Sequence, residues 1–164
     1  MTVYLRVSLV RYTVRQSSFK HLAQRILTAV GEATSELSVA LIGDARIQRL
    51  NREYRKQDQA TDVLAFPIRE AIMPQGKYPT TNMLGDVVIS VPTAVRQAKE
   101  LGRSIDVELA TLLIHGVLHL CGYDHERSSR EAVRMSRRER KVLEAIAPVP
   151  QLIRSSPQRQ RKVC

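Results

Sequence analysis

The chain has 164 residues, which is the length of one ordinary domain with a sizeable core. Its composition of 43% hydrophobic and 26% charged residues is typical of a globular protein, and no apolar run approaches the roughly 18 residues of a membrane span. The formal net charge of +10 favours a polyanionic partner, either nucleic acid or an acidic membrane surface. The alternative is that the basic residues, which concentrate late in the chain, form only a solvated helix face and a disordered tail.

The amino-terminal half mixes strand and helix patterns. Residues 2–12 and 36–43 are rich in β-branched residues that nearly alternate with polar ones, which predicts two strands. The first of them lacks the basic start, apolar block and cleavage site of a signal peptide. A helix lies between the strands, and a second helix, capped by Asp44, follows them. The residues expected to face inward from this second helix are Ile47, Leu50 and Tyr54.

The middle of the chain predicts two more strands, at residues 61–67 and 84–90. Residues 69–83, between them, contain two prolines and a glycine and are expected to form a loop. A helix then opens near Pro92 and closes at Gly102, the usual order of these two residues in a helix.

Two further helices are expected before the carboxyl terminus. The first, capped by Ser104 and ended by Gly122, is apolar on most sides and should be central and buried. The second begins with the capping-box spacing of Ser128 and Glu131. Its expected apolar anchors are Val133, Val142, Leu143 and Ile146.

Strands and helices mix without regular βα alternation, which predicts an α+β fold with one mixed β-sheet packed with helices. We expect a single domain over residues 1–150. Residues 151–164 are basic and lack apolar periodicity, so they are expected to be a disordered tail. Cys121 and Cys164 make a poor disulfide framework, which fits a reducing cytoplasm.

Three of the four histidines fall within one stretch of eleven residues, "HGVLHLCGYDH". His115 and His119 are four apart and share one face of a helix, so both imidazoles can reach one ion. Gly122 permits a left-handed turn, after which His125 can return to the same ion. Core histidines bonded to carbonyls would explain one such residue, but three at this spacing favour a metal site. Three nitrogen ligands with an open fourth position are typical of catalytic zinc, although imidazole also suits nickel, copper and iron.

This pattern resembles that of the metzincin zinc proteases, which place a catalytic glutamate directly after the first histidine. Gly116 stands at that position here. The usual general base for peptide hydrolysis is therefore missing, which argues against a protease while leaving the metal site in place. The resemblance implies a zincin-like central metal-binding helix.

The same stretch more closely resembles the signature of the YbeY family, bacterial rRNA-maturation factors described as zinc-dependent, single-strand-specific endoribonucleases. Two other segments resemble that family in the same order, "LNREYRKQDQATDVLAFP" and "LGDVVIS", so that the resemblance runs from Leu41 to Ile146. Ala60 and Ala65 depart from the proline and serine that are usual in the family. Only a role for the serine hydroxyl is thereby put in doubt.

The resemblance implies that His115, His119 and His125 hold one zinc ion and that Arg55 is functionally important. A guanidinium at that position can bind the scissile phosphate through two hydrogen bonds and stabilise developing charge. Asp62 and Asp86, in the matching segments, could orient a ligand histidine, act as a base or serve only as structural caps. Asp124 could likewise be a partner of a ligand or a turn residue.

The function implied is cytoplasmic cleavage of single-stranded RNA in rRNA processing, including maturation of the 16S rRNA 3′ end, and in ribosome biogenesis. The ribosome or ribosomal proteins are then expected partners, and a membrane is not. Two alternatives stay open: a non-catalytic ribosome assembly factor with a structural zinc, and a metal-dependent hydrolase of another substrate. The sequence does not give the oligomeric state.

Overall fold

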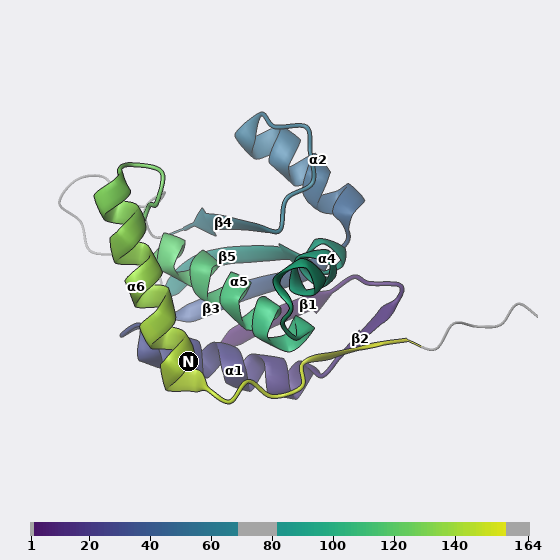
Figure 1. The fold of residues 1–164 in the computed structure, drawn as a ribbon, viewed down its shortest axis with the longest axis horizontal. Coiled ribbons are helices and arrows are strands. Elements are labelled where there is room, and N and C mark those ends of the chain that lie inside the picture. Colours follow the sequence, from purple (N-terminus) through teal and green to yellow (C-terminus); the bar gives the residue numbers. More distant parts are fainter. Residues whose placement is uncertain (1, 69–81, 157–164) are drawn as a thin grey trace, which may run out of the picture.

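In the computed structural model, which describes residues 2–68 and 82–156, a four-stranded mixed sheet lies at the centre of the molecule (Figure 1). The strand order is β1 (Val3–Val7), β3 (Glu36–Ile42), β5 (Met83–Ser90) and β4 (Val63–Pro67). The first three strands are parallel, and β4 is an antiparallel strand at the edge of the sheet. The predicted α+β class with a mixed sheet is confirmed.

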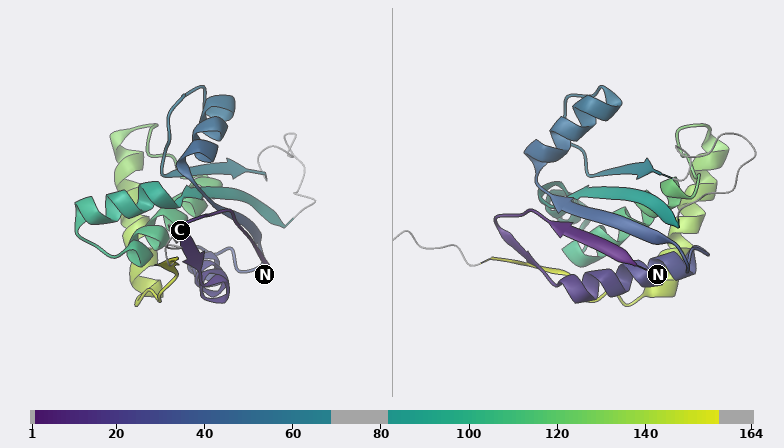
Figure 2. Two further views of the ribbon diagram at one scale, coloured as in Figure 1. Left: turned by 90° about the vertical axis from the view of Figure 1, so that its right-hand side faces the viewer. Right: turned by 180° about the vertical axis from the view of Figure 1, so that it is seen from behind.

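One face of the sheet is covered by helices, as the side view in Figure 2 shows. These helices are α1 (Gln16–Ala29), α4 (Val91–Leu101), α5 (Ile105–Leu120) and α6 (Ser129–Ile146). Helix α5 is central, because it contacts β4 and β5 and also packs against α1, α4 and α6. Most of its side chains are buried, as its all-round apolar pattern predicts.

Among the described residues, the opposite face carries one helix, α2 (Asp44–Arg55), over a smaller apolar cluster. That cluster consists of Ile42, Ile47, Leu64 and Val88. Tyr54, expected to face inward, is 65% exposed, so this prediction is wrong. Its ring lies edge-on against Phe66, with 5.3 Å between the ring centroids, and the remainder of the side chain stays in water.

The predicted ends of the helices are largely confirmed. The Ser104 hydroxyl accepts a hydrogen bond from the Val107 amide at 3.2 Å, and Gly102, with a φ of 65°, ends α4. The Ser128 hydroxyl accepts one from the Glu131 amide at 3.1 Å. Among the apolar anchors expected on α6, Val133 is the exception, because it points outward and is 51% exposed.

Asp44 does not cap α2 as predicted, because Gly43 is the cap residue. Its carboxylate instead accepts hydrogen bonds from Ser90 at 2.6 Å, Thr93 at 2.7 Å and Arg96 at 2.8 Å. All three donors lie where β5 passes into α4. Asp44 therefore fastens the start of α2 to the sheet, and α2 ends at Arg55.

The folded domain extends further toward the carboxyl terminus than predicted. Strand β6 (Ile153–Ser155) pairs antiparallel with β2 (Tyr12–Val14), which is a separate strand from β1. Leu152 and Ile153 are buried because they complete the main core. The domain boundary expected after Pro150 is therefore wrong for residues 151–156, whereas residues 157–164 lie outside the described residues.

Residues 69–81 of the predicted loop also lie outside the described residues, and Met83 already begins β5. Across residues 2–68 and 82–156, no helix combines the length and the apolar character that crossing a membrane requires.

Candidate metal centre

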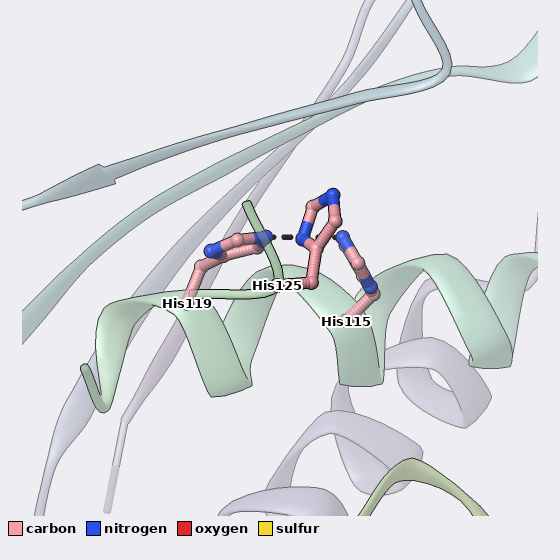
Figure 3. A group of neighbouring side chains, drawn as sticks. All are labelled: His115, His119 and His125. Atoms are coloured by element: carbon pink, nitrogen blue, oxygen red, sulfur yellow. Dashed lines mark hydrogen bonds between the residues drawn. The ribbon is translucent and has the colours of Figure 1, made fainter. Parts of the chain in front are cut away.

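Helix α5 and the turn that follows it bring His115, His119 and His125 together, as predicted (Figure 3). The first two project from one face of α5, near its carboxyl end. Gly122 then adopts a φ of 97°, in the left-handed region that favours glycine, and this turn sends the chain back toward the helix. His125 arrives from that turn, and its ring centroid lies 5.1 Å from that of His115 and 5.2 Å from that of His119.

The three imidazoles fit one metal ion. One nitrogen from each ring can be chosen so that all three lie within 4.8 Å of one another, and the Nε2 atoms of His115 and His119 are 3.1 Å apart. In a tetrahedral zinc site, Zn–N bonds of about 2.0–2.1 Å place neighbouring nitrogens about 3.3–3.4 Å apart. The arrangement is therefore close to that of a three-histidine site with room for a fourth ligand.

Burial favours the neutral, metal-binding form of one of these histidines. Removal of His119 from water lowers its pKa below the ordinary value of 6.5, and the neighbouring His115 and His125 lower it further. The charge of Asp124 acts in the opposite direction but is the weaker influence. Because only the neutral imidazole binds a metal, His119 stays available as a ligand at a lower pH than an exposed histidine does.

Glu139, on α6, contacts the site and was missed by the sequence analysis. Its Oε1 atom lies 2.6 Å from Nδ1 of His115. This contact engages Nδ1 as the hydrogen-bond donor and leaves Nε2 to face the other two histidines. Glu139 lies 24 residues after His115, on another helix, so no spacing rule connects the two; only the packing of α6 against α5 does.

Of the three aspartates considered from the sequence, Asp62 and Asp124 line the same hollow as the histidines, whereas Asp86 lines another one. The hydrogen bonds of Asp62 and Asp124 go to other groups. Asp62 accepts hydrogen bonds from the Val63 amide at 2.8 Å and from Gln97 at 3.2 Å, which is a structural role at the start of β4. Asp86 lies in register with Tyr4 and Ser38, on the sheet face turned away from α5. Asp124 accepts a hydrogen bond from the Glu126 amide at 3.0 Å, as a turn residue does.

Gly116 marks a close approach of α5 to the sheet. A Cβ atom at this position would lie 2.7 Å from Cγ1 and 3.1 Å from Cγ2 of Val87, a fully buried residue of β5. Real Cβ contacts are essentially never as short as 2.7 Å, so a larger side chain at this position requires Val87 to shift. A glutamate at this position, as in the metzincins, would collide with Val87 unless the packing changed.

The histidines line a hollow of about 700 Å³ that also contains Arg55. Its walls come from α5, from the loop after it, from β4 and from the end of α2. The Arg55 guanidinium donates to the Ala65 carbonyl oxygen of β4 at 3.2 Å, and the arginine itself is exposed. The structure thus brings Arg55 to the same hollow as the histidines, although 60 residues of sequence separate it from His115.

Comparison with known proteins shows which family the chain resembles. A family model described as "Endoribonuclease YbeY" matches residues 8–147. A solution structure of TM1509 from Thermotoga maritima is similar in fold, with a TM-score of 0.59 and 25% identity over 88% of each chain.

Curated relatives with the same name come from several bacteria. The protein of Anaeromyxobacter sp. is 50% identical over 75% of this chain, which spans 60% of that longer relative. Those of Geobacter metallireducens and Aquifex aeolicus are 45% and 43% identical over 80% and 86% of this chain, and 87% and 90% of their own lengths are covered. The chain therefore belongs to the endoribonuclease YbeY family.

Proposed function

We propose that the chain is a zinc-dependent endoribonuclease that cleaves single-stranded RNA during rRNA processing and ribosome biogenesis in the cytoplasm. Its membership of an endoribonuclease family supports the reaction class. We further propose that the ion is zinc, that the RNA is single-stranded, and that the chain acts at the 3′ end of 16S rRNA. The observation that carries it is the meeting of three imidazoles and one guanidinium in a single hollow.

The donor set supports zinc as the ion. Three imidazole nitrogens and an open fourth position are the arrangement of catalytic zinc, and no thiolate or carboxylate belongs to the cluster found among the described residues. A bound zinc would act as a Lewis acid toward a phosphoryl oxygen or a water molecule. We expect one such ion per chain.

The residues of the chain itself would do three things around that ion. His115, His119 and His125 would hold it, and Glu139 would fix the ring of His115 with Nε2 turned inward. Arg55 would bind the scissile phosphate, because its guanidinium offers several donors and needs only one for Ala65. A guanidinium so placed stabilises the charge that develops on the phosphoryl oxygens.

The substrate would be recognised mainly through its backbone. The chain has five tyrosines, two phenylalanines and no tryptophan, too few for an extended base-stacking platform. The net charge of +10 instead supplies attraction to phosphates that does not depend on base sequence. Charge alone does not distinguish one RNA from another, so we propose ribosomal RNA and the ribosome as partners on the strength of the family resemblance.

A comparison of two histidine variants tests the substrate class. His115→Ala removes a proposed ligand, whereas His21→Ala removes the fourth histidine, which is exposed on α1 and distant in sequence from the cluster. Wild type and both variants are assayed on single-stranded RNA, double-stranded RNA and peptides, with identical purification to exclude contaminating nucleases. We expect cleavage of single-stranded RNA by wild type and His21→Ala only. Equal RNA cleavage by His115→Ala, or cleavage of peptides alone, would contradict the proposal.

A further inference from the structure

Helix α6 carries a narrow stripe of positive charge along its exposed side. The stripe consists of Arg130, Arg134, Arg137 and Lys141. Successive members are four, three and four residues apart, so they follow one face of the helix. All four are exposed, and from residue 130 to residue 141 the helix rises about 16 Å.

The charges of this stripe are largely unneutralised. Arg134 has one weak partner, Glu131, at 3.8 Å, and both side chains reach solvent. Within the described residues, Arg130, Arg137 and Lys141 form no ion pair. Like charges at this spacing repel one another and disfavour the helix, so the stripe does not serve the stability of α6.

The stripe lines a hollow of about 820 Å³ together with Tyr123. The centre of the Arg134 guanidinium lies 5.2 Å from the centroid of the Tyr123 ring, which holds this arginine over an aromatic face. Five cationic side chains and one carboxylate line this hollow, so its field is strongly positive.

The loop between α5 and α6 separates this hollow from the metal centre. Tyr123 lines the hollow along the stripe, and the next three residues, 124–126, line the hollow of the histidines. The two hollows are therefore neighbours across one short loop. A chain of phosphates that leaves the metal centre over this loop meets the stripe directly.

We propose that the stripe on α6 binds the phosphate backbone of the RNA strand next to the segment that lies in the metal centre. This inference rests on the proposed function and adds a second contact region to it. An acidic membrane surface fits the stripe poorly, because a helix that lies on a membrane needs an exposed apolar face. The apolar face of α6, formed by Met135, Val142 and Ile146, is buried in the core, and the exposed Val133 alone does not make such a face.

The test neutralises the charges of the stripe and compares the result with neutralisation of four basic residues elsewhere. The stripe variant carries glutamine at its four positions, and the control carries glutamine at four exposed basic residues elsewhere. The control positions are Arg11, Arg15, Lys20 and Lys99. Binding of the holoprotein to a long and to a short 2′-O-methyl oligouridylate is followed by fluorescence anisotropy across a salt series. Thermal unfolding and a gel show that each protein is folded and each probe intact.

We expect the stripe variant to bind the long probe at least about tenfold more weakly and to flatten the slope of log K against log salt by about 2.8, or about 0.7 per lost contact. The short probe, which fills only the metal centre, should change less than about twofold, because it reaches no stripe residue. For the long probe, the control should change the slope of log K against log salt by less than about 0.7, the effect of one lost contact. A variant with lysine in place of the three arginines keeps the charge and should keep the slope.

Equal losses in the stripe variant and the control would overturn the inference, because only net charge would matter. An unchanged slope in the stripe variant would overturn it as well. Stripe-dependent binding to phosphatidylserine vesicles with unchanged RNA binding would assign the stripe to a membrane instead. RNA cleavage by wild type separates the two proposals: cleavage without a stripe effect refutes only the stripe, and stripe-dependent binding without cleavage refutes only the nuclease.

Discussion

Nδ1 of His115 and Oε1 of Glu139 lie 2.6 Å apart, and this contact joins α5 to α6 at the metal centre. A carboxylate on the far nitrogen of a ligand histidine fixes the tautomer and the ring orientation and makes the ligand more basic. Helix α6 therefore takes part in the site although it contributes no ligand.

Glu139→Ala should weaken metal binding by about 10- to 100-fold, because the His115 ring loses the partner that orients it. Glu139→Gln, which keeps a hydrogen-bond acceptor, should lose less. Competition with a chelator measures the affinity for zinc, and Glu144→Ala, an exposed glutamate on the same helix, is the matched control. Unchanged zinc affinity in Glu139→Ala would show that the contact has no positioning role.

Gly116→Ala should destabilise the protein by about 1–3 kcal/mol, the usual range for an overpacked core, because the new methyl group meets Val87 at 2.7 Å. Chemical denaturation measures the free energy of unfolding. Gly43→Ser, at a glycine with open space around it, should change that free energy by less than about 0.5 kcal/mol.

A second substitution shows whether Val87 is the cause. Val87→Ala removes the methyl groups that Gly116→Ala meets, so the double variant should recover part of the lost stability relative to the sum of the single changes. Strict additivity of the two single variants would rule out a collision between these residues as the origin of the effect.

Local rules predicted the histidine cluster from the sequence, because its ligands lie on one helix and the turn after it. The structure confirms that His115 and His119 lie on one helix and that Gly122 forms a left-handed turn after it. The position of Arg55 next to them could not be derived from spacing and came only through family resemblance. Glu139 could not be found in either way, because its contact depends on how two helices pack.

The errors in the predicted fold also arise because packing between segments distant in sequence cannot be read from local patterns. Tyr54 and Val133 matched helical periodicity, but each keeps more than half of its surface exposed in the folded chain. The end of the chain looked polar and basic, and two buried residues, Leu152 and Ile153, were too short a signal to predict β6. Pairing with β2, more than 100 residues earlier, burial in the core and hydrogen bonds from the Leu152 and Ile153 amides to Asp106 together give that segment its structure.

Asp44→Asn should lower stability by about 1 kcal/mol at neutral pH, because charge-assisted hydrogen bonds to a partly exposed carboxylate are weakened. Burial raises the pKa of Asp44, but hydrogen bonds from Ser90, Thr93 and Arg96 and the charge of Arg96 outweigh it, so its pKa lies below the ordinary 3.8. The charged form is therefore favoured by folding.

The pH dependence of this variant follows from that direction. The contribution of Asp44 is fully present above pH 3.8, the ordinary value, and is lost as the pH falls through the lower pKa of the folded protein. Denaturation of wild type and Asp44→Asn across an acidic pH series should show their stabilities converging at the acid end. A difference that is constant with pH would contradict the role given to the carboxylate.

Arg55→Ala should lower the single-turnover rate of RNA cleavage by about 10²- to 10³-fold, as expected for a group that stabilises transition-state charge. Binding of the RNA should fall much less, by about the effect of one phosphate contact. Arg49→Ala, an exposed arginine on the same helix, should leave both unchanged. If Arg55→Ala loses binding and cleavage to the same extent, Arg55 is only one more phosphate contact.

The most direct test of the account is a titration of the metal-free protein with zinc, in which bound zinc and the single-turnover rate of single-stranded RNA cleavage are measured together. We expect no cleavage without metal, a rate that rises in proportion to bound zinc, and a break in the titration at one ion per chain. His119→Ala should neither retain the ion nor recover cleavage. Full activity in the metal-free protein, or a His119→Ala variant that binds zinc and cleaves RNA as wild type does, would contradict it.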